Sequence, residues 1–138
     1  MTELRKFIGC PFKDKGRGSI DRKHRRPVYD CYGLFLSLFK HFGYDLPDFD
    51  ISCFATKDIY RKYVEQVGEW ERLDEPEVPC AVVLAVDDKH PNIINHVGVY
   101  VGDGKFIHTL ESTGSIVSHT YDILWKTKIK GYYRWKKS

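Results

Sequence analysis

The sequence predicts an α+β fold in which an N-terminal helix packs on an antiparallel β-sheet. An apolar segment with helical spacing covers 31–42, and a continuous apolar segment, 80–86, has the length of a buried strand. A third segment, 96–108, has two strand-like halves around the turn Gly102-Asp103-Gly104, as in a β-hairpin. Because 42% of the 138 residues are hydrophobic, the chain can bury a sizeable core, and we expect residues 1–138 to form one domain.

Both predicted helices have recognisable boundaries. Asp30 is a good N-cap for the first helix, since its carboxylate can accept a hydrogen bond from the first turn, and Gly43 is a typical stop. A second helix is predicted over 55–67, ending before Gly68. Its apolar residues share one side, so we expect it to pack against the rest of the domain; they are Ile59, Tyr60, Tyr63, Val64 and Val67.

The remaining segments are predicted as strands, turns and loops. An opening segment reaches about Phe12, and the basic stretch from there to Tyr29 is predicted to be a loop. The acidic, proline-containing segment 69–79 is predicted to be a linker. Two short strands over 115–121 and 131–135, with a helical turn at 122–126, are expected to complete the sheet.

Charge and hydropathy exclude some partners. The net charge is +3, and the excess lies between Lys13 and Arg26. A basic loop can dock an acidic polymer, but no aromatic residues interleave with these charges, so we favour a solvated loop and expect no nucleic acid partner. No segment approaches the roughly 20 apolar residues of a membrane span, and the N-terminus leads into no signal-type segment. We therefore expect synthesis in the cytoplasm without a signal peptide, and no membrane span.

The four cysteines indicate reduced thiols. Cys10, Cys31, Cys53 and Cys80 form no C-x-x-C pair, so neither a zinc ribbon nor a compact disulfide framework is indicated. Cys10, Cys53 and Cys80 are interpreted as structural thiols.

Cys31 is the candidate nucleophile because it stands in the first turn of the first helix. Unpaired N–H groups and the positive end of the helix dipole stabilise a thiolate there, so we expect the pKa of Cys31 to be lowered. The alternative is that Cys31 is a small buried hydrophobic residue, which is the commoner case for a cysteine at such a position.

Two histidines of the hairpin are predicted to meet. A register centred on the Gly102-Asp103-Gly104 turn places Gly98 opposite His108, and strand alternation then puts His96 and His108 on the same face. One imidazole can therefore orient the other behind a nucleophile. We expect the start of the Cys31 helix to pack over Gly98, where the missing side chain leaves space.

A zinc site is an alternative use of the same residues. One cysteine and two histidines, Cys31, His96 and His108, match a known catalytic ligand set, but the sequence offers no evident fourth ligand or general-base glutamate. We therefore expect neither metal nor cofactor. The other four histidines receive no role; they are His24, His41, His90 and His119.

Several motifs together carry a resemblance to a known family. They are Ile8-Gly9-Cys10-Pro11-Phe12, Asp30-Cys31-Tyr32-Gly33-Leu34, the whole of 96–108 and Gly131-Tyr132-Tyr133-Arg134. With these motifs the chain resembles the NlpC family of papain-like cysteine peptidases, which cut bacterial cell-wall peptides, and most of all its bacteriophage-tail branch. The resemblance implies a papain-like α+β fold with Cys31 as nucleophile, His96 as general base and His108 as the residue that orients His96.

The resemblance also implies a substrate. It is the stem peptide of peptidoglycan, cut between D-glutamate and a diamino acid by a Cys-His-His triad through a thioester. By the same resemblance Asp30, Tyr32 and Phe12 stand at substrate-binding positions. Phe12 replaces a tyrosine that is common in the family, and Tyr32 replaces a common serine, so this subsite is expected to differ.

Two other functions fit the same fold. One is a non-catalytic cell-wall-binding or phage tail-assembly module, which the changes at Phe12 and Tyr32 favour and the intact Cys31, His96 and His108 disfavour. The other is an amidase or acyltransferase that uses the same thiol. Expected partners are peptidoglycan stem peptides and, from the phage-tail resemblance, tail proteins, with action at the cell wall, including as a virion tail component.

Overall fold

A computed structural model describes residues 2–136, apart from the side chains of Thr2, Thr56 and Tyr63. The helices and strands, in chain order, are η1 (Thr2–Phe7), β1 (Arg17–Asp21), β2 (Arg26–Tyr29), α1 (Cys31–His41), α2 (Thr56–Gln66), η2 (Val67–Glu69), β3 (Trp70–Leu73), β4 (Cys80–Leu84), β5 (His96–Gly102), β6 (Lys105–Leu110), β7 (Gly114–His119), α3 (Ile123–Lys126) and β8 (Ile129–Trp135).

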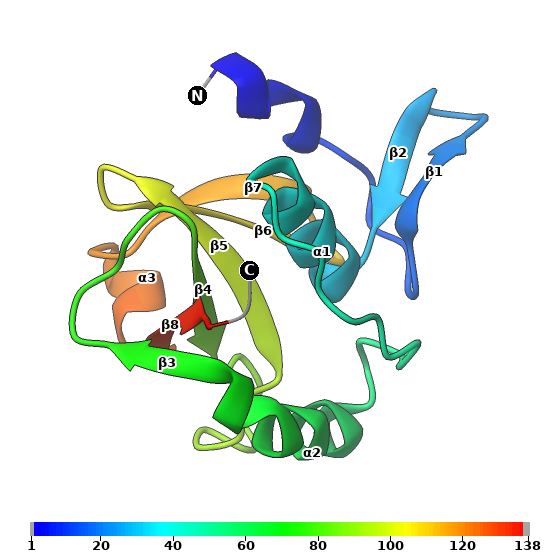
Figure 1. The fold of residues 1–138 in the computed structure, drawn as a ribbon. Helices are drawn as coiled ribbons and strands as arrows, with labels where there is room; N and C mark the ends of the chain where they lie inside the picture. The colour runs from blue at the N-terminus through cyan, green and yellow to red at the C-terminus, as the bar shows by residue number, and fades with distance from the viewer. Residues whose placement is uncertain (1, 137–138) are drawn as a thin grey trace.

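The core lies on both faces of a six-stranded antiparallel sheet with the order β3-β8-β4-β5-β6-β7 (Figure 1). Apolar residues of α1 pack with those of β4, β5 and β6 on one face, whereas Trp125 of α3 packs with Val82, Leu84 and Phe106 on the other. The predicted α+β class, a helix on an antiparallel sheet, is confirmed. No helix within residues 2–136 is both long and apolar enough to cross a bilayer.

Helix α1 begins and ends where the sequence predicts. The Asp30 carboxylate accepts a hydrogen bond from the Gly33 N–H at 2.8 Å, which satisfies one unpaired donor of the first turn. At the other end the helix stops at His41, and Gly43 has a φ of +95°, a conformation that glycine adopts without strain. The buried face carries Leu34, Phe35, Leu38 and Phe39.

The β5–β6 hairpin has the predicted register, but α1 lies on the other face. Val99 pairs with Ile107 and Tyr100 with Phe106, which puts His96 and His108 on one face as expected. The prediction that α1 packs over Gly98 is wrong, because α1 packs on the face of Val99 and Ile107. A Cβ on Gly98 would lie 3.0 Å from the Phe106 ring and 3.1 Å from the His108 Cβ, so neighbouring side chains fill that space.

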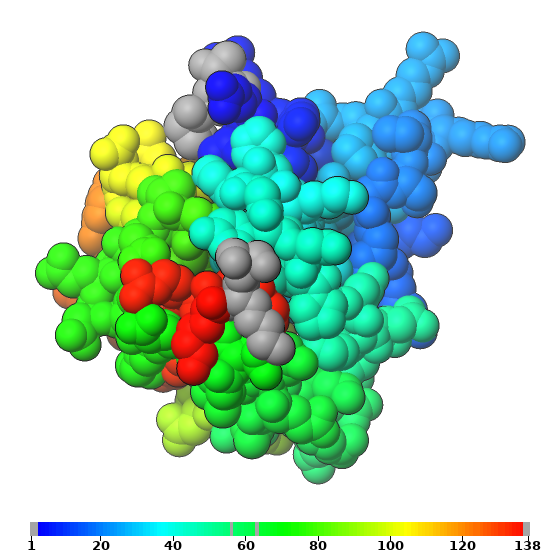
Figure 2. Space-filling model, viewed as in Figure 1, coloured from blue at the N-terminus to red at the C-terminus, as the bar shows by residue number. Residues whose placement is uncertain are grey.

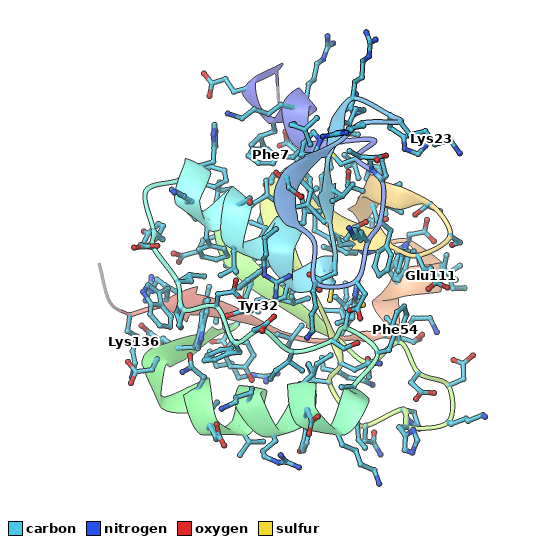
Figure 3. All side chains as sticks on the ribbon, turned by 90° about the vertical axis from the view of Figure 1, so that its right-hand side faces the viewer. Phe7, Lys23, Tyr32, Phe54, Glu111 and Lys136 are labelled. Atoms are coloured by element: carbon cyan, nitrogen blue, oxygen red, sulfur yellow. The ribbon has the colours of Figure 1, made fainter. Side chains whose placement is uncertain are left out.

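Two segments that were predicted to be irregular contain strands. The basic stretch forms the β1–β2 hairpin, a separate two-stranded sheet whose tip carries exposed charges; Lys23 is one of them and points away from the body (Figure 3). The predicted linker contains β3, which pairs with β8. Partners distant in sequence stabilise it, since the Trp70 and Trp135 rings lie 4.8 Å apart and Arg134 pairs with Glu71 at 2.8 Å. Neither segment has the apolar alternation that predicts a strand.

Helix α2 forms as predicted, but only part of its predicted packing side faces inward. Val64 and Val67 are exposed, at 49% and 43%, so the expectation that they pack against the domain is wrong. The expectation is confirmed for Ile59, which faces inward and, with Lys62 one helical turn further on, lines a cavity beside α1. In Figure 1, α2 lies at one end of the molecule, away from the small hairpin. The side chain of Tyr63 is outside the described part of the chain.

The β1–β2 region meets the first turn of α1 through a contact between two glycines. A Cβ built on Gly33 would lie 1.9 Å from the carbonyl oxygen of Gly16, far inside any real contact distance. Figure 2 shows the resulting arrangement, with the hairpin projecting from the side of the molecule next to α1. Gly33 is therefore required for the close approach of these two backbones.

We predict that Gly33→Ala lowers the free energy of unfolding by about 2–3 kcal/mol, because backbone atoms have to separate to admit the methyl group. Gly68→Ala is the matched control, since a Cβ there meets nothing within 4 Å. Urea denaturation of both variants measures the difference. Equal stability of the two variants would show that the Gly16–Gly33 approach is not a constraint on the fold.

Candidate active site

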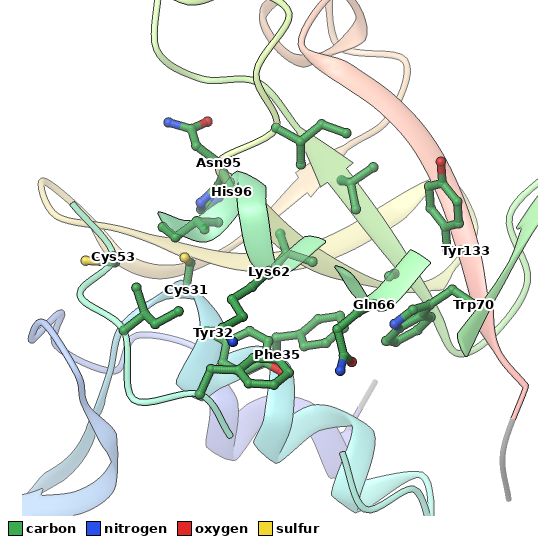
Figure 4. Close-up of a pocket in the computed structure, with 17 residues that line it drawn as sticks. Cys31, Tyr32, Phe35, Cys53, Lys62, Gln66, Trp70, Asn95, His96 and Tyr133 are labelled. Atoms are coloured by element: carbon green, nitrogen blue, oxygen red, sulfur yellow. The ribbon is translucent and has the colours of Figure 1, made fainter. Parts of the chain in front are cut away.

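The Cys31 side chain lies at one end of a partly open cavity. The cavity has a volume of about 130 Å³, and its walls come from α1, α2, the sheet and the segment 49–53 between the two helices. Cys31 and His96 both line it, and their side chains lie next to each other in Figure 4. Each is largely buried, with 7% and 6% of its surface exposed.

The pKa of Cys31 is raised, so the expectation of a lowered pKa is wrong. Burial is the larger cause and the nearby Asp30 carboxylate the second, and together they raise the pKa to about 12. Hydrogen bonds from backbone groups of Val97 and Tyr32 act in the opposite direction and only partly offset this. The helix start does favour a thiolate, but the carboxylate that caps the helix occupies the same position and disfavours it.

His96, His108 and Ser118 form a buried chain of hydrogen bonds. Nε2 of His96 lies 2.8 Å from Nδ1 of His108, and Nε2 of His108 lies 2.8 Å from the Ser118 hydroxyl. His108 is fully buried, with its ring 4.6 Å from that of Phe106 and 4.7 Å from that of Trp125. Because Nε2 of His96 bonds to His108, Nδ1 is the ring nitrogen of His96 that is available to a group in the cavity.

Both imidazoles are neutral at ordinary pH. Burial lowers the pKa of His96, and burial together with the neighbouring His96 lowers the pKa of His108. A neutral thiol, that of Cys31, and a neutral imidazole, that of His96, therefore lie at the same end of the cavity. Such a pair is able to exchange a proton when a reaction at the sulfur requires it.

Asp30 is buried behind the cysteine and does not line the cavity. Its carboxylate is fully buried and accepts three hydrogen bonds of 2.8 Å: from the Gly33 N–H, from the Lys15 N–H and from the Arg17 guanidinium. The same guanidinium also binds Asp48, with contacts of 2.9 and 3.1 Å. This carboxylate is saturated by the protein's own donors, and its assignment to substrate binding stays a prediction.

The other two predicted substrate-binding residues are placed differently. Tyr32 lines the cavity with its ring, but its hydroxyl donates to the Pro47 carbonyl at 2.5 Å and is not directed at a substrate. Phe12 is not among the described residues that line the cavity, and its ring packs 6.0 Å from that of Phe54. Their roles toward a substrate also stay predictions.

Three residues of this region have no role predicted from the sequence. Ser118 pairs with Phe106 across β6 and β7, so strand alternation places it on the face of His108 once that register is known. Arg17 is missed because it lies in a segment that was predicted to be a loop. Cys53, interpreted as structural, is half-buried on the cavity wall, whereas Cys10 and Cys80 are buried.

The residues of the alternative zinc site, Cys31, His96 and His108, are not arranged as ligands of one metal ion. His96 and His108 direct a nitrogen at each other at hydrogen-bond distance, and the second nitrogen of His108 bonds to Ser118, so the pair has no common open position. Among the described residues, Asp14, Asp30 and Cys53 have potential ligand atoms within 4.8 Å of one another. Arg17 and Ser52 already bind the two carboxylates.

Comparison with known proteins gives matches across most of the chain. The family model described as the NlpC/P60 family matches residues 16–134. Gamma-DL-glutamyl hydrolase of Bacillus subtilis is 25% identical over 97% of this chain and 28% of its own length. Gamma-D-glutamyl-L-lysine dipeptidyl-peptidase of the same organism is 27% identical over 80% of this chain and 31% of its own length. The chain thus spans less than a third of these two relatives.

Solved structures match the fold over almost the whole chain. NlpC2 from Trichomonas vaginalis has a TM-score of 0.64 at 18% identity and covers 99% of this chain, which in turn spans 45% of that protein. The NlpC/p60 domain of the peptidoglycan hydrolase SagA has a TM-score of 0.56 at 17% identity, with 96% of this chain and 93% of that domain covered. Because the sequence identities of these structures are below 20%, the matches support a conclusion about the fold only.

We predict that the free energy of unfolding decreases as the pH falls from 6.5 to 5. The unfolded chain binds protons on His96 and His108 in this range, whereas the folded chain, in which both pKa values are lowered, does not. Each imidazole contributes a slope of up to about 1.4 kcal/mol per pH unit, and its contribution becomes constant only well above the unfolded pKa of about 6.5. His108→Gln removes one group, so urea denaturation at several pH values should give a smaller slope. An unchanged slope would contradict this assignment.

Proposed function

This chain belongs to the NlpC/P60 family, and we propose that it is a cysteine peptidase that hydrolyses the stem peptides of bacterial peptidoglycan. The observation that carries the proposal is the position of Cys31 at the start of α1, in one cavity with His96, whose other nitrogen is bonded to His108. A nucleophile, a base and a residue that orients the base are the parts that acyl transfer by a thiol requires.

The relatives support the choice of bond. Two of them are named for gamma-glutamyl bonds, one of these between D-glutamate and L-lysine, and a structural neighbour is named a peptidoglycan hydrolase. We therefore propose the amide between D-glutamate and the diamino acid of the stem peptide as the bond that is cut. From this substrate we also propose that the protein acts at the cell wall. From the motif resemblance we propose further that it is delivered within a phage tail, with tail proteins as partners.

In the first step the Cys31 thiol transfers its proton to Nδ1 of His96 and its sulfur attacks the carbonyl carbon of the scissile amide. His96 is neutral in the resting site, so its Nδ1 has a free lone pair for this proton, although burial makes the imidazole a weaker base than in water. The hydrogen bond to His108 fixes the orientation of the His96 ring and stabilises the imidazolium that forms. A preformed thiolate is not required, since the proton leaves the sulfur as the new bond forms.

In the second step the tetrahedral intermediate collapses, the C–N bond breaks, and the imidazolium of His96 protonates the leaving amine. A thioester on Cys31 remains, and water that loses its proton to His96 hydrolyses it, which restores the thiol. We assign the backbone N–H of Cys31, at the start of α1, as one donor to the oxyanion. Removal of such donors in other enzymes costs roughly 3–4 kcal/mol.

Ser118 is proposed as a positioning residue of this chain of hydrogen bonds. For Nδ1 of His108 to accept from His96, the proton of His108 has to be on Nε2, from which it is donated to the Ser118 hydroxyl. Ser118 therefore provides an acceptor for the tautomer of His108 that supports His96 as a base. Ser118 is not among the described residues that line the cavity, and by this proposal it does not contact the substrate.

We predict that the wild type cuts purified peptidoglycan fragments and that Cys31→Ala does not. Mass spectrometry of the products identifies the new peptide ends and with them the bond. Cys80→Ala is the matched control, because Cys80 is a fully buried thiol on β4 outside the cavity and its loss should leave cleavage intact. Products from a non-peptide amide would instead favour an amidase. The absence of cleavage by the folded wild type across several wall types would favour a non-catalytic wall-binding or tail-assembly module.

We predict that Ser118→Ala lowers kcat about tenfold with little change in KM, since one hydrogen bond that stabilises a charged group is lost. The acid limb of the kcat profile, which reports protonation of the His96 base, should move to lower pH, because the imidazolium of His96 is then less stable. Ser118→Thr retains the hydroxyl and should restore both values. If Ser118→Ala alters only stability and leaves the pH profile unchanged, Ser118 is structural.

A further inference from the structure

Most of the side chains that line the Cys31 cavity are apolar or aromatic; the exceptions include Lys62, Gln66, Asn95 and His96. Its walls are formed by Phe35 of α1, by Phe49 and Ile51 of the following segment, by Ile59 of α2 and by Val83 of β4. These residues come from four separate parts of the chain, and Cys31 with His96 forms one end (Figure 4). A group that occupies the cavity therefore lies directly beside the reacting sulfur.

Charged groups have no partner inside this cavity. Lys62 is the one lysine, arginine or carboxylate residue among the described residues that line it. Its ammonium pairs with Glu65 at 3.1 Å and lies 5.4 Å from the Phe49 ring centre, and its side chain is 40% exposed, so it marks the solvent side. A carboxylate or ammonium group placed deeper would lose its water without gaining a counter-charge.

The volume is suited to one compact apolar group. At about 130 Å³ the cavity is slightly smaller than the roughly 150 Å³ apolar cavity that admits benzene in another protein. Burial of a methylene group in such a site is worth about 0.8 kcal/mol, which corresponds to about a fourfold gain in affinity for each added carbon. Apolar lining therefore gives a measurable preference for chain length.

We propose that this cavity is a subsite for an apolar group, either an aromatic or branched aliphatic side chain or a short acyl chain, carried next to the carbonyl that Cys31 attacks. The inference rests on Cys31 being the nucleophile of the proposed function. It does not depend on a wall peptide being the substrate. It indicates that substrates which place an apolar group in this cavity react better than those which place a charged group there, so the charged groups of a stem peptide have to lie outside it, on the solvent side marked by Lys62.

The test uses the chemistry of the thiol alone. N-methyl, N-butyl, N-hexyl and N-benzyl iodoacetamide alkylate cysteine, and intact-protein and peptide mass spectrometry measure the rate at Cys31. Each rate is divided by the rate of the same reagent with N-acetylcysteine, which removes differences in intrinsic reactivity. We expect the N-hexyl and N-benzyl reagents to react at least tenfold faster than the N-methyl reagent after this correction.

Two variants on α2 distinguish the cavity from the rest of the helix. Ile59→Asp introduces a carboxylate into the lining and should remove the preference for apolar reagents, whereas Val64→Asp, on the exposed side of α2, should retain it. Ile59→Trp fills the cavity and should also remove the preference, which provides a second variant if the aspartate prevents folding. Circular dichroism verifies that each variant is folded.

The outcomes separate this inference from the proposed function. A flat series in the wild type, or equal loss of preference in Ile59→Asp and Val64→Asp, overturns the subsite even if wall fragments are cut. A clear preference for apolar reagents supports the subsite even if wall fragments are not cut. If no reagent labels Cys31 in the folded protein, the subsite beside a reactive sulfur is overturned, whereas the nucleophile is judged by the loss of cleavage in Cys31→Ala.

Discussion

The hydrogen bonds of the buried Asp30 carboxylate are the interactions on which the position of helix α1 and of Cys31 depends. The carboxylate caps α1 through Gly33 and ties the β1–β2 region to the same turn through Arg17 and the Lys15 N–H. A buried charge with three donors is stable, whereas the loss of one partner would leave it uncompensated. Because Cys31 is the next residue, the position of its sulfur is set by these contacts. The same carboxylate helps to raise the pKa of the thiol.

This arrangement is consistent with a resting site without net charge. Burial holds the Cys31 thiol protonated and the His96 and His108 imidazoles neutral, and Ser118 completes the chain behind them. In a low-dielectric cavity the thiolate–imidazolium ion pair of Cys31 and His96 is costly to form. It forms only when a bound substrate has displaced water and the sulfur attacks its carbonyl carbon. The apolar lining that keeps the site neutral is also what makes the cavity selective for uncharged groups.

Local signals in the sequence were sufficient for the elements that contain Cys31 and the two histidines. The Asp30 cap, the Gly43 stop and the turn at Gly102-Asp103-Gly104 define α1 and the β5–β6 register without tertiary information. The β1–β2 hairpin and β3 lack the apolar alternation of a strand, and β3 pairs with β8, which is distant in sequence, so periodicity did not reveal them. The exposure of Val64 and Val67 on the α2 side depends on how the helix packs in the folded chain. The pKa of Cys31 was predicted with the wrong sign because burial and the Asp30 charge are properties of the folded chain.

The central claim is that Cys31 forms a covalent acyl intermediate. Rapid acid quenching of the wild type with a stem-peptide substrate, followed by intact-protein mass spectrometry, tests it directly. The account predicts a mass increase equal to the acyl half of the substrate, located on the peptide that contains Cys31 and released by neutral hydroxylamine, as a thioester is. Product formation without any adduct, at a rate that Cys31→Ala does not change, would contradict it.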